Sequence, residues 1–520
     1  MPLVPLSGLG ALGLIADVAP QDVPVSNEKS EATGLTGLTN MRMRDGYAQR
    51  FGGLALAAPL TPPVAAPYWL QPFNTVSGRF WIHAGLASVR ADDGTTQTNI
   101  TGTPPTGAID DRWTGGVLSG VLVMSNGIDV PQFWGGTGVL ANLTGWDATW
   151  RCRALRPFKQ YLVGVGWNIA SADRPHLVKW SAAAEPGAVP TSWDEADPTL
   201  DAGEVDLAET PDRMVDMLPM GDANIIYKDQ SMWSMRQSFG SSIFTFQRLP
   251  GDVGAIAPGC IADTPVGHVV MTYGDVIVHS GQGPRSILDG RMRKWLRARL
   301  GTENYRRSFV AVNSANSEVW ICFPETGDAV CTMALVWNWQ TSAIGVRDLP
   351  GVTYGAAGRM PITAPVALWS GASGTWDTQA GVWFASQNNA SEVRLVMARA
   401  SAPSLLLADQ GLLDGASSFG ATIERSGLSF GDAESVKTAR GLYLQIDAVA
   451  GSELFVQIGS AMTAEEAPTY TAPASYIVGT TFKVDAFVTG RLLAFRIYSV
   501  GAFDWRIAGL RFDIVKRGRF

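Results

Sequence analysis

The sequence predicts an all-β protein: a degenerate β-propeller of six or seven blades, preceded by an N-terminal arm and followed by an antiparallel β-sandwich. Three observations lead to this prediction. The 520 residues include 57 Gly, 30 Pro and 18 Trp, which is typical of short strands joined by turns. A strand–turn–strand unit that closes on an aromatic residue recurs through the middle of the chain. Alternating apolar and polar residues then continue to the C-terminus.

Changes in composition divide the chain into three predicted regions. Residues 1–67 form the arm with a few strands and end in the Pro-rich connector "LTPPVAAP". Residues 68–410 hold the recurring unit and form the propeller-like region. Residues 411–520 follow a linker-like stretch and contain long alternating strands such as "RGLYLQIDAV" and "WRIAGLRFDIVKRGRF". This last region therefore predicts the sandwich.

The propeller prediction rests on hairpins and on their spacing. Hairpins are expected over 121–134, which contains an Asn-Gly turn, and over 224–236, 268–281 and 318–339. A period of about 45–55 residues with four short strands each is the pattern of propeller blades. An unrelated array of sandwiches is the alternative, because tryptophans in any β-rich chain fall at irregular spacings. The closing tryptophans lie 46 to 53 residues apart except for one gap of 104: Trp81, Trp134, Trp180, Trp233, Trp337 and Trp383.

Composition and charge exclude several classes of protein. The net charge of −7 and the pI near 5.3 argue against a surface that grips nucleic acid broadly. The first basic residue is Lys29 and no charge-free apolar stretch resembles a membrane helix, so we expect neither a signal peptide nor a membrane-spanning segment. Four cysteines are too few for a disulfide scaffold. We expect buried thiols, with a Cys322–Cys331 disulfide across a hairpin as the alternative.

Two short motifs match catalytic or cofactor-binding patterns in their residue spacing, but the surrounding sequence lacks the structural context that each pattern needs. Gly8, Gly10 and Gly13 spell G-x-G-x-x-G, but nearby prolines leave no room for the strand and the helix that a dinucleotide site needs. Ser429 lies in G-x-S-x-G, yet no histidine follows it as a hydrolase triad requires. We therefore expect no catalytic residue, cofactor or metal. The histidines lack metal-ligand spacing: His83, His176, His268 and His279.

A basic cluster lies in "RMRKWLRARLGTENYRR", residues 291–307. Its apolar residues fall at helical spacing, and its cations lie mostly on the opposite side. A short surface helix with a solvated basic face explains it, and docking to an acidic partner or to phosphates is the alternative. The candidate partner-docking residues are Arg291, Arg293, Lys294, Trp295 and Arg297.

An acidic stretch over 193–216 carries nine carboxylates and one arginine. Its spacing does not fit a calcium loop. A solvated acidic loop is one interpretation, and an acidic rim or lumen that faces a like-charged passage is the other. The candidate lumen or rim residues are Asp194, Glu195, Asp197, Asp201, Glu204 and Asp206.

Segments in a fixed order along the chain carry a resemblance to a known family. They are "NMRMRDGYAQRFGG", "LVMSNGIDVPQFW", "RPHLVKWSAAAEPGAVPTSW", "NIIYKDQSMWSMR", "EVWICFPETGDAVCTMALVWNW" with "VRDLP", "ATIERSGLSF" and "TGRLLAFRIYS". With these segments the chain resembles the tail nozzle proteins of short-tailed bacteriophages, also called tail tubular protein B or head–tail stabilization proteins. The long apolar N-terminal arm departs from that pattern. The family is structural, so the resemblance carries no catalytic residues.

The resemblance implies a homohexameric ring below an adaptor ring, in a virion tail assembled in the host bacterial cytoplasm. It also implies a lumen that conducts double-stranded DNA during genome ejection, and tail fibres or spikes attached at the side. A cationic lumen would bind phosphates and slow the DNA, so we expect an acidic or neutral one. The alternatives are a glycan-binding propeller, such as a receptor-binding tail component, and a glycoside hydrolase with paired carboxylates at one rim.

Overall fold

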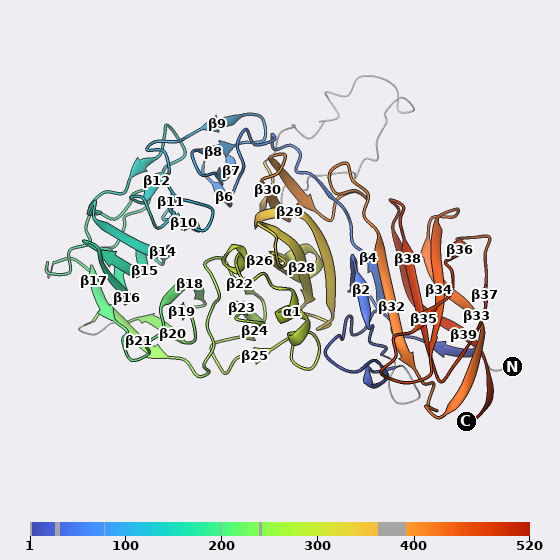
Figure 1. Cartoon of the computed structure of the whole chain (residues 1–520). Coiled ribbons are helices and arrows are strands. Elements are labelled where there is room, and N and C mark those ends of the chain that lie inside the picture. The colour runs from blue at the N-terminus through green and yellow to red at the C-terminus, as the bar shows by residue number, and fades with distance from the viewer. Residues whose placement is uncertain are drawn as a thin grey trace, which may run out of the picture.

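The computed structural model describes residues 3–25, 32–76, 78–197, 199–238, 242–361 and 392–519. Strands make up 51% and helices 3% of it, which confirms the all-β prediction. Figure 1 shows the two parts of the molecule: a ring of small sheets, and a stack of long strands that holds both ends of the chain.

Five four-stranded antiparallel sheets follow one another along the chain, each built from four consecutive strands. The strands of the first two are β6 (Trp69–Asn74), β7 (Arg79–Ala84), β8 (Val89–Asp92), β9 (Gln97–Asn99), β10 (Thr114–Leu118), β11 (Val121–Ser125), β12 (Gln132–Trp134) and β13 (Ala141–Asn142). Those of the next two are β14 (Trp150–Phe158), β15 (Tyr161–Ile169), β16 (Ala172–Trp180), β17 (Gly203–Asp206), β18 (Met214–Met220), β19 (Ala223–Lys228), β20 (Met232–Gln237) and β21 (Phe244–Arg248). The fifth contains β22 (Ile261–Thr264), β23 (Gly267–Thr272), β24 (Asp275–His279) and β25 (Arg285–Ser286).

A long strand shared between the sixth and seventh sheets continues this series. The sixth sheet is β26 (Phe309–Asn313), β27 (Glu318–Phe323), β28 (Cys331–Asn338) and the first half of β29 (Ile344–Arg359). The second half of β29 pairs with β30 (Val393–Arg399), which pairs with β31 (Ser404–Ala408). The N-terminal strand β5 (Leu54–Leu56) pairs with β31 and completes the seventh sheet.

The seven sheets form a closed circuit, which we call the ring of sheets (Figure 1). Apolar clusters join neighbouring sheets, and Leu70 and Trp81 of the first sheet pack with Val396 and Leu405 of the seventh. Burial between sheets protects both faces of each small sheet. The circuit is β-propeller-like, and a true propeller of six or seven blades stays a prediction.

The hairpins expected from the sequence are present. Strand pairs β11–β12, β19–β20, β23–β24 and β27–β28 are all antiparallel neighbours. Trp134, Trp180, Trp233 and Trp337 lie on the third strand of their sheets, where they are buried between neighbours. Trp81 lies on a second strand instead. Trp383 lies outside the described residues.

Two antiparallel sheets face each other in the C-terminal region and form the sandwich. One contains β33 (Ser435–Ala448), β37 (Val484–Gly490) and β39 (Trp505–Arg519). The other contains β32 (Ala421–Leu428), β34 (Glu453–Ala461), β35 (Thr469–Tyr470), β36 (Ala474–Ile477) and β38 (Leu492–Ser499). Phe495 and Phe512 meet across the two sheets with ring centroids 6.3 Å apart.

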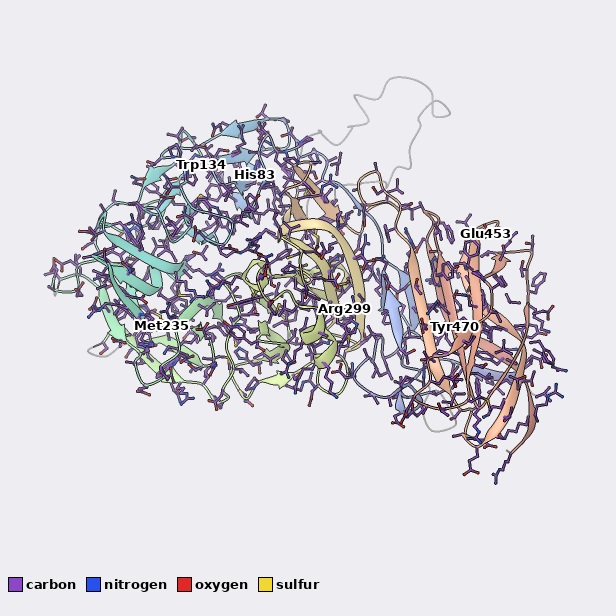
Figure 2. All side chains as sticks on the ribbon, in the orientation of Figure 1. His83, Trp134, Met235, Arg299, Glu453 and Tyr470 are labelled. Carbon is purple, nitrogen blue, oxygen red and sulfur yellow. The ribbon has the colours of Figure 1, made fainter. Side chains whose placement is uncertain are left out.

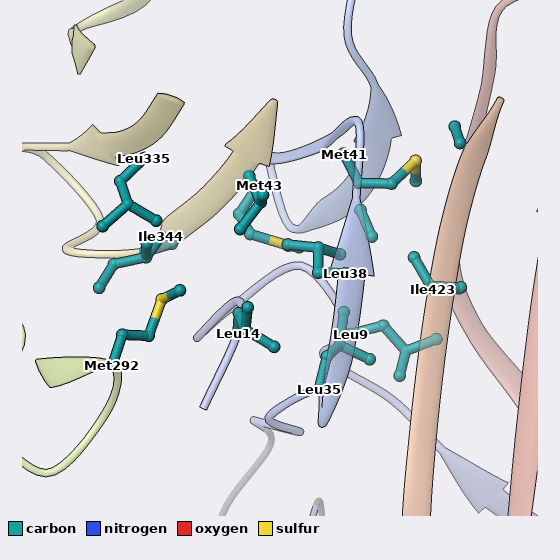
Figure 3. Packing of buried hydrophobic residues seen from close by; sticks show 14 of the residues in the cluster. Leu9, Leu14, Leu35, Leu38, Met41, Met43, Met292, Leu335, Ile344 and Ile423 are labelled. Carbon is teal, nitrogen blue, oxygen red and sulfur yellow. The ribbon is translucent and has the colours of Figure 1, made fainter. Parts of the chain in front are cut away.

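The N-terminal segment is woven into both parts. Strand β1 (Leu3–Leu6) pairs with β39, and β2 (Gly37–Thr39) pairs with β32. Strands β3 (Met41–Arg44) and β4 (Tyr47–Arg50) connect β29 of the ring to β39 of the sandwich in one hydrogen-bonded series. Figure 3 shows Leu14, Met43 and Leu38 of this segment lying between Met292 and Ile423.

Close backbone contacts explain the glycines of the G-x-G-x-x-G match. A side-chain carbon on Gly13, whose φ is 77°, would lie 2.0 Å from the Ile344 carbonyl oxygen, and one on Gly10 would lie 2.3 Å from the Tyr47 backbone. These glycines therefore let the arm cross β29 and the β3–β4 turn. Ser429 lies in the turn between β32 and β33, a strand–turn–strand setting.

Candidate functional site

The innermost strands of the ring converge on a set of side chains that we call the axial cluster: Trp69, Arg156, Asp216, Phe309 and Tyr354. They come from β6, β14, β18, β26 and the second half of β29. These strands belong to the first, third, fourth, sixth and seventh sheets. Phe309 and Tyr354 lie 5.6 Å apart between ring centroids. Tyr354 packs against three of the apolar clusters that join the sheets. The side chains of the axial cluster thus occupy the middle of the ring where these inner strands approach one another.

A buried ion pair lies within the axial cluster. Arg156 donates from Nε and Nη2 to the two oxygens of Asp216, at 2.6 and 2.7 Å. The Gly259 amide also donates to Asp216, at 2.9 Å. Burial opposes the charge of Arg156, yet its pKa lies above the ordinary value because the Asp216 carboxylate attracts the guanidinium and accepts its hydrogen bonds. The pair ties together the third, fourth and fifth sheets.

The predicted basic helix exists as α1 (Arg293–Arg299), and its apolar face packs as expected. Met292 and Leu296 are buried. The Asp17 carboxylate accepts hydrogen bonds from the backbone amides of Lys294 and Trp295, at 2.8 and 3.0 Å. The N-terminal arm is therefore attached to the first turn of this helix.

Contacts within the chain engage most of the predicted docking cations. Arg291 donates to the Ser342 carbonyl at 2.7 Å, and Arg297 donates to the Gly274 carbonyl at 3.1 Å. Arg293 forms ion pairs with Asp275 and Asp289, at 2.8 and 3.1 Å. Arg299, labelled in Figure 2, stacks over Trp295 and pairs with Glu325. Lys294 is exposed, and docking at this helix stays a prediction.

The predicted acidic residues lie on β17 and on the loop before it, at the outer edge of the third sheet (Figure 1). Glu195 and Glu204 form ion pairs with the buried Lys179. Asp201 accepts a hydrogen bond from the Tyr161 hydroxyl at 3.1 Å. These residues therefore lie on the rim of the ring and far from its axial cluster.

The other three acidic residues are turn-forming or exposed. Asp194 accepts a hydrogen bond from the Ala196 amide at 3.0 Å, and Asp197 accepts one from the Thr199 amide at 2.9 Å. Asp206 is exposed on β17. A role in a lumen requires that this outer rim face the passage of an assembly, and that stays a prediction.

A buried arginine network joins the ring to the sandwich, and sequence reasoning missed it. The Phe419 ring lies between the guanidinium groups of Arg50 and Arg347, at 3.8 and 3.9 Å. Arg347 also pairs with Asp414 and donates to the Asn40 side chain at 3.0 Å. The alternation in residues 39–53 predicts a strand with one buried face. The pattern does not show that arginines such as Arg50 lie on the buried face, so the network could not be predicted from it.

Asn40 is the centre of this junction. Its Nδ2 donates to Asp348 at 2.9 Å and to the Gly420 carbonyl at 2.7 Å, while its Oδ1 accepts from Arg347 and from the Asp348 amide. Nearby, Arg42 pairs with Asp409 and Glu318. Burial raises the pKa of Glu318 to about 7, against the opposing charge of Arg42.

A second polar chain connects the fourth and fifth sheets. The Tyr227 hydroxyl lies 2.7 Å from Nδ1 of His268 and 2.6 Å from Nε2 of His279. Nε2 of His268 lies 3.0 Å from the Pro219 carbonyl oxygen, so every bond forms when both imidazoles are neutral. Burial lowers the pKa of each histidine to about 4.

Other predicted features have simple outcomes. All four cysteines are free and buried, so the Cys322–Cys331 disulfide alternative is not formed. Among the residues that the structure describes, no group of three or more His, Cys, Asp and Glu side chains is arranged to hold a metal ion. Within the same residues, no helix has the length and apolar character to span a membrane.

Comparisons with known proteins leave the family open. No family model matches the sequence, and no curated protein matches it either. Among solved structures, the crystal structure of the computationally designed Ika8 protein matches 77% of this chain and 99% of its own length. The identity is 12% and the TM-score is 0.37, values at which the likeness carries no argument about fold or function.

Proposed function

We propose that this chain is a structural subunit of a short-tailed phage tail: a nozzle protein that forms a hexameric ring below an adaptor and conducts DNA during ejection. The proposal rests on the ordered segments that resemble the tail nozzle family across nearly the whole sequence. It assigns the protein to the virion tail, after assembly in the host cytoplasm. Fibres or spikes would bind its side.

The observation that best supports self-assembly is an apolar edge on the sandwich. Strand β37 is the last strand of its sheet within the described residues. Phe487 on β37 is 73% exposed, and Phe482 just before it is 77% exposed. Val449 and Ile477 are exposed as well. An open strand edge with large apolar side chains is typical of a protein contact, and the proposal takes a second copy of this chain as the partner.

The contacts that join the ring and the sandwich suit a subunit that must resist mechanical force. The N-terminal segment pairs with strands of both the ring and the sandwich, and the Arg347–Asp414 pair is buried where they meet. Because the axial cluster occupies the middle of each ring of sheets, the proposed DNA path runs between copies and not through one copy. Six copies carry six times the formal charge of −7, which favours a passage that repels phosphates.

Native mass measurement and electron microscopy of the purified full chain test the proposal, first alone and then mixed with the adaptor protein of a short-tailed phage. We expect six-fold rings whose yield rises when the adaptor is present. A monomer under both conditions, or a lumen lined continuously by Arg and Lys, would contradict the proposal.

The glycan-binding alternative has less support. The glycan-binding alternative expects exposed tryptophan rings as stacking platforms for sugars, whereas none of the tryptophans among the described residues is exposed. A glycan array separates the two functions, because a nozzle subunit is expected to give no saturable signal on it.

A further inference from the structure

A cleft of about 220 Å³ opens beside the axial cluster and has no role in the proposed function. Its lining comes from four sheets of the circuit or from the loops that adjoin them, which can meet only near the middle of the ring. Arg112 precedes β10, Arg153 lies on β14, and Arg306 follows the fifth sheet in a short 3-10 turn, Tyr305–Arg307.

Partners within the chain for the three arginines are few: Arg112 lies 5.6 Å from the centroid of the Tyr354 ring in the axial cluster, and Arg306 forms a hydrogen bond with the Tyr305 side chain. Arg112 is 8% exposed, and its Nη2 is buried with no hydrogen-bond partner among the described residues. Neither Arg112 nor Arg153 forms an ion pair with a described residue. Burial lowers the pKa of Arg153, with Asp229 opposing and the charge of Arg306 adding to the effect. A buried cationic donor without a partner is costly unless a ligand satisfies it.

Two carboxylates also line the cleft, but contacts outside it hold them. Arg307 donates to both oxygens of Asp110, at 2.7 and 3.0 Å. Asp111 accepts a hydrogen bond from the Ala108 amide at 2.7 Å. With Asp110 neutralised by Arg307, the arginines outnumber the remaining acid of the lining.

We propose that this cleft binds a phosphate-type oxyanion through Arg112, Arg153 and Arg306. Guanidinium groups that approach from one strand and two loops of the ring match the several oxygens of a tetrahedral anion better than the two oxygens of a carboxylate. The ligand is either free phosphate or the terminal phosphate of a nucleotide, since the same donors recognise both. This site is independent of the proposed nozzle function, because it lies within a single chain.

Isothermal titration of the full chain tests the site with two probes, potassium phosphate and adenosine 5′-monophosphate, each against potassium chloride at equal ionic strength. The first variant is Arg306→Gln, which should leave the fold intact because Arg306 is exposed. The second variant is Arg153→Gln. Arg248→Gln is the matched control, because Arg248 is 46% exposed on β21 and pairs with Asp252.

Saturable binding of phosphate, weakened about tenfold in both cleft variants and unchanged in Arg248→Gln, supports the site with free phosphate as the ligand. If adenosine 5′-monophosphate binds more tightly than phosphate, and both cleft variants weaken its binding about tenfold, the result supports the site with a nucleotide phosphate as the ligand. If neither probe gives saturable heat beyond that of chloride, or if the control loses as much affinity as the cleft variants, the proposal is overturned whether or not the chain forms rings.

Discussion

The ring of sheets and the sandwich are stabilised by cores of different construction. In the ring, separate apolar clusters lie between neighbouring sheets, and each sheet is built largely from strands that follow one another in sequence. In the sandwich, one large cluster includes residues from both ends of the chain, from Leu6 to Ile514, and it continues into the fifth and sixth sheets of the ring through residues such as Met271 and Leu335. The ring therefore depends on many local contacts, whereas the sandwich depends on a few pairings between distant segments.

Two features join these parts: the apolar cluster that continues from the sandwich into the ring, and the polar junction network. Asn40, Arg347 and Asp414 connect the N-terminal segment, the ring and the linker before the sandwich. If this network couples the parts strongly, a defect in one core destabilises both. The predictions below test that coupling.

The largest effects are expected from matched cavities in the two cores. Trp167 is fully buried in the ring, stacked on Trp146 at 5.0 Å, and Phe495 is fully buried in the sandwich. Trp167→Ala and Phe495→Ala should each lower the free energy of unfolding by about 3–5 kcal/mol. Hydrogen exchange should then rise first in β14–β16 for the ring variant and in β32 and β38 for the sandwich variant. Equal increases in both parts would show that the molecule opens as one unit.

Removing the Asn40 side chain should separate the two parts. Asn40→Ala removes one hydrogen bond from Arg347, which keeps its pair with Asp414, and removes the bonds of Asn40 to the side chain and the amide of Asp348, so we expect a loss of about 1–3 kcal/mol. Urea unfolding should then show two transitions in place of one. Asn40→Gly is the control, because the backbone of Asn40 has φ of 55° and Gly relieves that strain. If Asn40→Gly is as stable as the original protein, the side-chain bonds contribute no more than the relief of the backbone strain.

Acid should destabilise the ring before the sandwich, because all four histidines lie on ring strands. The folded pKa of His268 and His279 is about 4, below the ordinary value of 6.5. Between these values the unfolded chain binds more protons, so stability is full above pH 6.5 and is lost as the pH falls toward 4. The slope is up to about 1.4 kcal/mol per pH unit for each histidine.

The double variant His268→Gln/His279→Gln should reduce this slope in urea unfolding measured from pH 4 to 7. A residual slope is expected from His83, whose pKa burial also lowers to about 4. Val64→Ser, which removes no titratable group, is the control and should keep the full slope. An unchanged slope in the double variant would mean that the Tyr227 chain does not hold the imidazoles neutral.

The same contrast explains what the sequence could predict. The hairpins of the ring carry their signal locally, as in the Asn126–Gly127 turn, so the strands and turns could be predicted, whereas the sequence pattern leaves the number of sheets open between six and seven. The pairing of Leu3 with Asp513 joins residues at opposite ends of the chain and leaves no local pattern. The basic helix was visible from its period, but its capping by Asp17 was not, because the partner lies 277 residues away. Arg156 and Asp216 likewise resemble ordinary surface charges in the sequence, because they lie 60 residues apart and meet only in the folded ring.

The smallest effect on stability, and the clearest on assembly, is expected at the apolar edge of the sandwich. Phe487 is 73% exposed, so Phe487→Ser should change the free energy of unfolding by no more than about 0.5 kcal/mol. If β37 forms the contact between copies, native mass measurement should show fewer oligomers at the same concentration, because the contact loses a large apolar anchor. Val64→Ser is the matched control, since Val64 is 72% exposed on the connector before the ring. Equal losses of oligomer in both variants would mean that general surface apolarity, and not this edge, drives association.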